Sequence, residues 1–444
     1  MSKIKLSDHF TYSKLLRFVF PSIIMMVFTS IYGVVDGLFV SNFAGKTAFA
    51  SINLVMPFVM ILGGIGFMIG TGGTALVSKV LGEGKKEKAN EIFTMMIIFT
   101  LLLGTLLSVI GVTSMPWVAK FLGATEEMMA DCVIYGRIVT GFTVAFMLQN
   151  VFQSFLIAAE KPKLGLLATV LAGITNMALD AIFIIVFKWG VAGAAIATGL
   201  SQCVGGIFPL IYFLRKNSSL LRLTKTKLEI KPILNACGNG SSELMSNISS
   251  SVVSMIYNFQ LMKYVGEDGV SAYGVLMYVQ FIFVAIYIGY AIGCAPITGY
   301  HFGARNHNEL KNMLRKSSFL SAVSGVVLTI LAIALSSPLA KIFVGYDEEL
   351  YELTRHAFRL FAYSFLLAGF NIFTSSFFTA LNNGAVSAAI SFMRTLIFQT
   401  SSVLILPIFL GVDGIWWAIT VAEFFAFILS LIFLFAKRKK YNYI

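Results

Sequence analysis

The sequence predicts an all-α integral membrane protein with 12 transmembrane helices, arranged as two six-helix bundles related by an internal repeat. Hydrophobic residues make up 57% of its 444 residues and charged residues only 12%, about half the charged share of an ordinary globular domain. Long tracts carry no charge, and the chain matches itself at one constant offset. These three observations together define the fold class.

Uncharged tracts of this length must cross a membrane as helices. A helix needs about 20 apolar residues to span a hydrocarbon core of roughly 30 Å. At that depth no water satisfies the backbone N–H and C=O groups, so the segments have to be helical.

The first half contains six predicted spans. Pro21 and Asp36 lie in the first and Asp180 in the fifth, whereas the sixth carries no charge. A glycine-rich stretch in the second span, 63–73, lacks the Lys-Ser/Thr of a nucleotide-binding loop, so we assign it to close helix packing. In chain order the six spans are 15–40, 52–79, 92–115, 133–158, 164–187 and 193–214.

The second half also contains six predicted spans. The seventh begins with a polar stretch that includes Glu243, the eleventh holds Arg394 and the twelfth holds Glu423. The other three are nearly free of charge. In chain order the spans are 237–262, 270–300, 317–337, 356–380, 387–409 and 413–436.

The two halves are copies of one another. Gly45 matches Gly266 and Gly82 matches Gly303, which gives an offset of 221 residues. A constant offset over a long stretch indicates an internal repeat, and transporters built this way bind substrate between their repeats. At this offset, and without a gap, further identical pairs are Ala119/Ala340, Lys120/Lys341, Asn150/Asn371, Ala159/Ala380 and Gly190/Gly411.

The positive charge follows the membrane topology. The formal net charge is +12, but alternate assignment of the loops places 23 Lys and Arg on the side of the N-terminus and seven on the other. By the positive-inside rule both termini are cytoplasmic, and no nucleic-acid partner is needed. We expect a monomer in the cell membrane, with lobes at 1–214 and 237–444. The basic linker at 215–236 has a composition compatible with a helix on anionic headgroups.

Four polar residues of the first half form the candidate ion site. Asp36, Asn176, Asp180 and Thr198 lie at similar depth in three spans, and Asn176 and Asp180 share a helix face because they are four residues apart. Ionisable residues inside spans are functional candidates. At the 221-residue offset their counterparts are Tyr257, Ile397, Ser401 and Ile419. A carboxylate pair in one half alone suggests a cation site.

Two ions are compatible with this chemistry. Two neighbouring carboxylates repel one another in a low dielectric, so one of them can carry a transported proton. Alternatively, the carboxylate, amide and hydroxyl oxygens form a cage for Na⁺. The alternative to an ion site is a hydrogen-bonded cluster that only stabilises the packing of these helices. No other cofactor is expected.

Further candidates are individually weaker. Tyr135 lies at a depth from which it can reach the acid pair. Glu243 is a candidate for the substrate cavity or else a solvated helix start, and Glu423 either lines the cavity or pairs with Arg394. The sequence also suggests Met56 and Met60 as adaptable cavity residues, and Pro21 as a bend or hinge.

Together these residues resemble the multidrug and toxic compound extrusion (MATE) family. The motifs are Pro21-x14-Asp36-Gly37 in the first span, Gly82-Glu83-Gly84 after the second, and Asn176-x3-Asp180 followed by Gly190-x-x-Gly193. The resemblance implies an antiporter that exports amphipathic organic cations or drugs from a cavity between two lobes. It also implies an ion site in the N-terminal lobe at Asp36, Asn176, Asp180, Thr198 and Tyr135.

Three other functions are less compatible with the sequence. A flippase for lipid-linked oligosaccharides shares the broad architecture but needs several cations facing the cavity, and beyond the terminal four residues of each span the only Lys or Arg residues are Arg137 and Arg394. A receptor or scaffold needs a larger soluble part. An enzyme needs a nucleophile or metal-ligating histidines beside the carboxylates, so we expect none.

Overall fold

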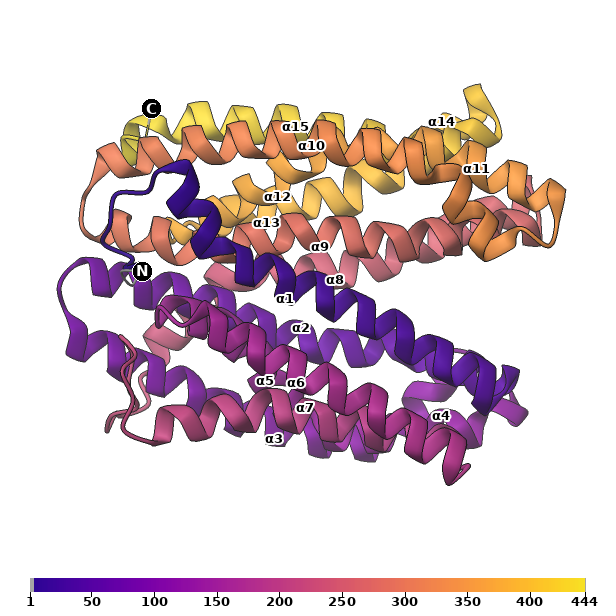
Figure 1. Cartoon of the computed structure of the whole chain (residues 1–444), viewed down its shortest axis with the longest axis horizontal. Helices are drawn as coiled ribbons and strands as arrows, with labels where there is room; N and C mark the ends of the chain where they lie inside the picture. Colours follow the sequence, from indigo (N-terminus) through magenta and orange to yellow (C-terminus); the bar gives the residue numbers. More distant parts are fainter. Residues whose placement is uncertain (1–3, 444) are drawn as a thin grey trace.

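The computed structural model describes residues 4–443 as a bundle of long helices, with no strand among them (Figure 1). The elements of the first half are α1 (Tyr12–Phe39), the π-helical turn η1 (Val40–Ala44), α2 (Lys46–Gly82), α3 (Lys86–Phe121), α4 (Glu126–Gly141), α5 (Thr143–Ala158), α6 (Pro162–Asp180), the π-helical turn η2 (Ala181–Val186) and α7 (Gly190–Leu214).

The second half repeats this order. Its elements are α8 (Ile230–Tyr264), α9 (Glu267–Gly303), α10 (His307–Val344), α11 (Glu348–Ala362), α12 (Phe365–Ala380), α13 (Gly384–Phe392), the π-helical turn η3 (Met393–Phe398), α14 (Gln399–Leu410) and α15 (Val412–Tyr441).

Every predicted span corresponds to one helix or one interrupted helix. Among the described residues nine helices are long and apolar enough to cross a membrane, and two bent pairs raise the number to eleven. The bent pairs are α4–α5, at 53°, and α11–α12, at 49°, and they are counterparts in the repeat. The remaining predicted span, the seventh (237–262), lies in α8, which has 35 residues but a more polar composition.

The two halves form two lobes that meet along four helices. Figure 1 shows the first lobe, from indigo (α1) to magenta, beside the second, from pink (α8) to yellow, with α1 running along the boundary between the two. The most extensive contacts between the lobes join α2 with α8 and α1 with α9. Because α8 and α9 are the repeat counterparts of α1 and α2, the contact between α2 and α8 is equivalent to the contact between α9 and α1 under the internal repeat.

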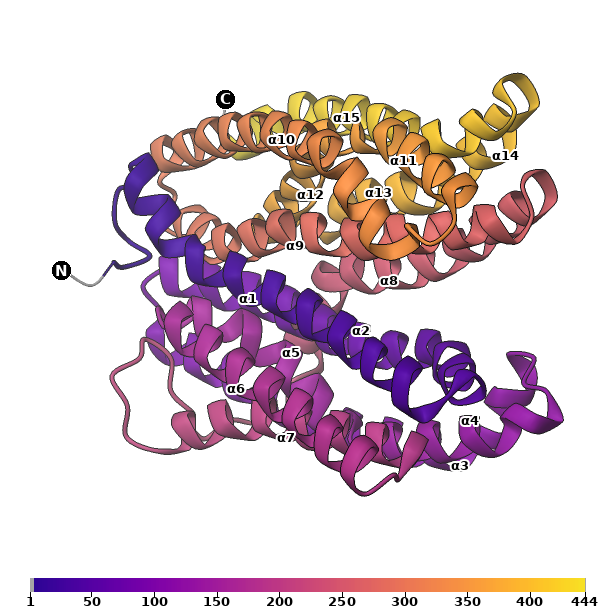
Figure 2. The same cartoon turned by 45° about the vertical axis from the view of Figure 1, so that its right-hand side comes forward.

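Glycines bring the lobes into backbone contact at one end. Both chain ends lie at this end, which we call the termini end, and the ribbons of the two lobes diverge toward the opposite end (Figure 2). A Cβ on Gly82 would lie 1.9 Å from the carbonyl oxygen of Tyr300, and one on Gly303 would lie 1.9 Å from that of Lys79. Only glycine allows two helices to approach this closely.

The linker between the lobes is hydrogen-bonded to side chains of α3. Residues 216–229 form no helix, in contrast to the surface helix that the composition allowed. The side chain of Asn90 accepts from the N–H of Arg222 at 3.0 Å, and that of Thr94 accepts from the N–H of Thr224 at 3.0 Å. These backbone N–H groups are therefore satisfied by α3 rather than by a helix of their own.

Candidate ion site and lobe interface

The predicted ion-site residues of α1 and α6 meet in the first lobe. Asp36 lies near the end of α1, and Asn176 and Asp180 occupy successive turns of α6. The side chains of Asp180 and Asn176 are next to the carboxyl of Asp36, and Asp180 is completely buried, at 0% exposure. Both acids are close to a π-helical turn, η1 after Asp36 and η2 after Asp180. Such turns often occur at functional sites.

Several oxygen atoms of this group have no donor. Asp36 Oδ1, Asn176 Oδ1 and both carboxylate oxygens of Asp180 are buried without a hydrogen-bond partner among the described residues. Thr198 Oγ1 of α7 is likewise buried and unpartnered within residues 4–443. A buried polar atom without a partner costs about 1–3 kcal/mol, and a charged one costs more. The protein has thus gathered acceptors that a proton or a cation would satisfy.

Two tyrosines border the acids. Tyr135 of α4 is buried and lies close enough to Asp36 and Asp180 to interact electrostatically with both. This position agrees with the depth at which the sequence places Tyr135. Tyr32 of α1 lies beside Asp36 and hydrogen-bonds to Gln149 of α5. Sequence analysis missed Tyr32, although its position four residues before Asp36, on the same helix face, was an available signal.

The second lobe has no such cluster at the corresponding place. Tyr257, which replaces Asp36, stacks on Tyr273 with ring centroids 4.9 Å apart and planes 6° from parallel. Both rings belong to the hydrophobic core of that lobe. The asymmetry inferred from the sequence is therefore also an asymmetry of packing, because a stacked aromatic ring stands at the position that corresponds to Asp36.

The second lobe has a different ionic centre, which is internally neutralised. Arg394 Nη2 lies 2.7 Å from Glu423 Oε1, and Arg394 Nε donates to both carboxylate oxygens at 2.9 and 3.0 Å. Asn371 Nδ2 donates to Glu423 Oε2 at 2.7 Å. Of the two alternatives for Glu423, pairing with Arg394 is the one that the structure adopts.

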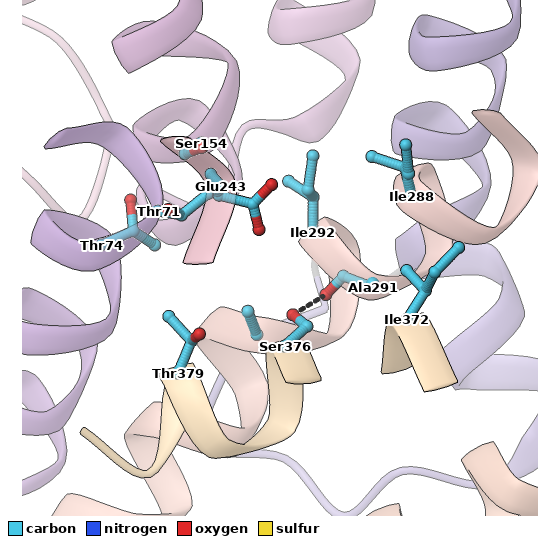
Figure 3. A pocket seen from close by; sticks show the side chains of 11 residues that line it. Thr71, Thr74, Ser154, Glu243, Ile288, Ala291, Ile292, Ile372, Ser376 and Thr379 are labelled. Atoms are coloured by element: carbon cyan, nitrogen blue, oxygen red, sulfur yellow. Dashed lines mark hydrogen bonds between the residues drawn. The ribbon is translucent and has the colours of Figure 1, made fainter. Parts of the chain in front are cut away.

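Glu243 faces a cavity between the lobes. The cavity has a volume of about 50 Å³, and Figure 3 shows the Glu243 carboxylate pointing into it. Its lining residues are Thr71 and Thr74 of α2, Ser154 of α5, Glu243 of α8, Ile288, Ala291, Ile292 and Ala295 of α9, and Ile372, Ser376 and Thr379 of α12.

The remaining candidates lie away from this cavity. Met60 is exposed, and Met56 packs against the core cluster of the first lobe around Tyr135. Pro21 is buried within α1, which continues through it without a break. Groups of three or more His, Cys, Asp or Glu side chains able to hold a metal are absent from residues 4–443.

The architecture defines a class of protein. Nine apolar helices and two bent helix pairs among residues 4–443 make it a multi-pass membrane protein, and two repeated lobes with oxygen-lined sites in and between them are the architecture of a secondary transporter.

Comparison with known proteins gives the family. The profile of the MatE family matches residues 21–182 and a second time residues 244–402. The chain belongs to this family of transporters, and the two matches reproduce the internal repeat.

Similar proteins cover nearly the whole chain. The multidrug export protein MepA of Staphylococcus saprophyticus is 24% identical over 440 residues, covering 96% of this chain and 94% of that protein. MepA of Staphylococcus haemolyticus is 23% identical, covering 97% and 94%. A solved structure, the outward-facing conformation of a multidrug resistance MATE family transporter of the MOP superfamily, has a TM-score of 0.93 at 22% identity. It covers 100% of this chain and 99% of that one.

Proposed function

We propose that this protein is a cation-coupled antiporter that exports amphipathic organic cations and drugs. The observation that carries the proposal is the group of unpartnered oxygens around Asp36 and Asp180. Membership of a transporter family, and the similarity to proteins named for multidrug export, support the direction and the substrate class. The coupling ion is H⁺ or Na⁺, and the protein lies in the cell membrane with both termini cytoplasmic.

Coupling requires that ion and substrate favour different conformations. A ligand shifts a conformational equilibrium only by its difference in affinity for the two states, and such coupling is reciprocal. An ion that neutralises the Asp36–Asp180 pair stabilises one packing of α1 against α6. If substrate binds the other packing more tightly, each ligand displaces the other. A membrane potential contributes about 2.3 kcal/mol per charge per 100 mV to inward ion movement.

The test is efflux of a fluorescent organic cation from proteoliposomes under a single imposed gradient. One series uses a pH gradient without Na⁺, and the other uses a Na⁺ gradient at equal pH. We expect one gradient to drive efflux, and Asp36→Asn and Asp180→Asn each to lower the driven rate at least tenfold. Asp413→Asn is the matched control, because its half-exposed carboxylate pairs with His356 outside the proposed site. Its rate should stay within twofold of wild type.

Two results would refute this proposal. One is the absence of efflux under both gradients, and the other is a normal gradient dependence in both aspartate variants. The first result would revive the oligosaccharide flippase as the alternative. The structure offers that function little support, since Arg394 is engaged by Glu423 and Arg137 Nε donates to the Val112 carbonyl oxygen at 3.2 Å.

A further inference from the structure

We propose that the cavity at Glu243 is a second binding site, which holds the protonated amine end of an exported compound and selects amines with N–H donors over quaternary ammonium ions. The substrate class rests on the proposed function, but the site is a different one from the ion site. The repeat counterpart of Asp36 in α8 is Tyr257, which lies 14 residues after Glu243. At 1.5 Å per residue Glu243 is therefore about 21 Å along the helix axis from the level of the ion site.

The cavity presents acceptors and one negative charge. Within the described part of the chain, no hydrogen-bond donor or cation pairs with the carboxylate of Glu243. This carboxylate points into the cavity (Figure 3). Thr74 Oγ1 and Ser154 Oγ, both of residues only 2% exposed, have no hydrogen-bond partner either. A charged group beside two unpartnered hydroxyls is stabilised by a ligand that brings donors and positive charge.

Two further hydroxyls of the lining offer lone pairs rather than protons. Thr71 Oγ1 donates to the carbonyl oxygen of Phe67 at 2.9 Å, and Ser376 Oγ donates to that of Ala291 at 3.3 Å. Their hydrogens are therefore committed to the backbone. An ammonium group is a donor with no acceptor, and it complements such a lining.

The opposite wall favours an organic ligand over a bare ion. Ile288, Ile292 and Ile372 of the second lobe line the same cavity, and an alkali ion gains nothing from hydrocarbon contacts. A volume of about 50 Å³ is enough for a few water-sized groups but far below the roughly 300–1,000 Å³ of drug-sized sites. The head group fits here, with its carbon chain against the isoleucines.

The lining explains the selection among cations. Quaternary ammonium ions are typically recognised by aromatic faces, and none of the lining residues is aromatic. A quaternary head group also has no N–H to give to Glu243, Thr74 or Ser154. Because α2 and α5 come from one lobe and α8, α9 and α12 from the other, a bound amine contacts both lobes at once.

The test is equilibrium binding to the full-length protein in nanodiscs, by calorimetry in a potassium buffer without any gradient. The probes are n-octylammonium and n-octyltrimethylammonium, which share one hydrocarbon chain. We expect n-octylammonium to bind at least tenfold more tightly, and Glu243→Gln to weaken its binding at least tenfold, the range for losing a charge-assisted hydrogen bond. Thr74→Val should weaken it a few-fold.

The controls separate this proposal from the antiport proposal. Glu83→Gln changes an acid that pairs with Lys85 outside the cavity and should bind n-octylammonium like wild type. Because binding is measured without an ion gradient, its outcome does not depend on the result of the efflux assay. Equal affinity for the two probes would overturn the proposal, and this comparison needs no variant. It would also be overturned if Glu243→Gln bound normally, or if Na⁺ displaced the amine and bound in a Glu243-dependent way.

Discussion

Replacement of Arg394 by methionine tests how the second lobe keeps a buried carboxylate. Glu423 is 1% exposed, and the side chain of Arg394 is 17% exposed. Arg394 supplies the contacts at 2.7, 2.9 and 3.0 Å, whereas Asn371 supplies the one remaining side-chain donor, at 2.7 Å. The variant therefore leaves a buried charge with one N–H, and removing one partner of a buried pair costs about 3–5 kcal/mol.

The measurement is the free energy of unfolding of purified protein, from equilibrium unfolding in mixed detergent–dodecyl sulfate micelles. We expect Arg394→Met to lose about 3–5 kcal/mol. The double variant Arg394→Met/Glu423→Gln should recover at least half of this loss, because the charge is then gone while Asn371 keeps an acceptor.

Arg137→Met is the matched control for this experiment. Arg137 is also an arginine within a predicted span, but it is exposed and its Nε donates only to a carbonyl oxygen. Its loss should cost about 1 kcal/mol or less. The argument would be refuted if Arg394→Met lost no more than Arg137→Met, or if the double variant were no more stable than Arg394→Met alone.

Two further predictions concern the contacts within and between the lobes. Gly303→Ala places a Cβ 1.9 Å from a backbone oxygen of α2, so it should destabilise the protein by about 1–3 kcal/mol. Gly274→Ala in the same helix has open space around the new Cβ and should be neutral or stabilising. Thermal unfolding in detergent distinguishes the two variants, and equal effects on stability would contradict the contact at Gly303. Asn90→Ala removes the acceptor for the Arg222 N–H, so trypsin should cleave the linker at Lys225 several-fold faster than in wild type, and an unchanged cleavage rate would mean that this bond does not hold the linker.

The sequence alone predicted that the acids of the candidate ion site lie together, because a charged residue in an apolar span is a strong local signal. Asp36 and Asp180 interrupt apolar spans at similar depth, and the internal repeat shows that the second half lacks them. The structure brings both acids and Asn176 together. Depth and helix face follow from residue number through the fixed rise and turn of the helix, which is why this part of the site could be foreseen.

The pairing of side chains from distant helices could not be foreseen in the same way. Glu423 had two alternatives in the sequence, and only the packing of η3 against α15 decided for Arg394. The same holds for Glu243, whose carboxylate faces a cavity because α2, α5, α9 and α12 converge around it. Rotation of any one helix would change these neighbours without changing its hydropathy.

The sequence by itself determined that the chain crosses the membrane many times, that its halves are copies, and that one half alone carries a carboxylate pair. Each follows from transfer free energies and spacings that are local to the chain. Only the tertiary structure decided the bends of 53° and 49° in two spans, the linker without a helix, the close contacts of Gly82 and Gly303 with the backbone of the opposite helix, and the cavity at Glu243. These depend on close packing between segments far apart in sequence, where a shift of one atom's width changes the contact.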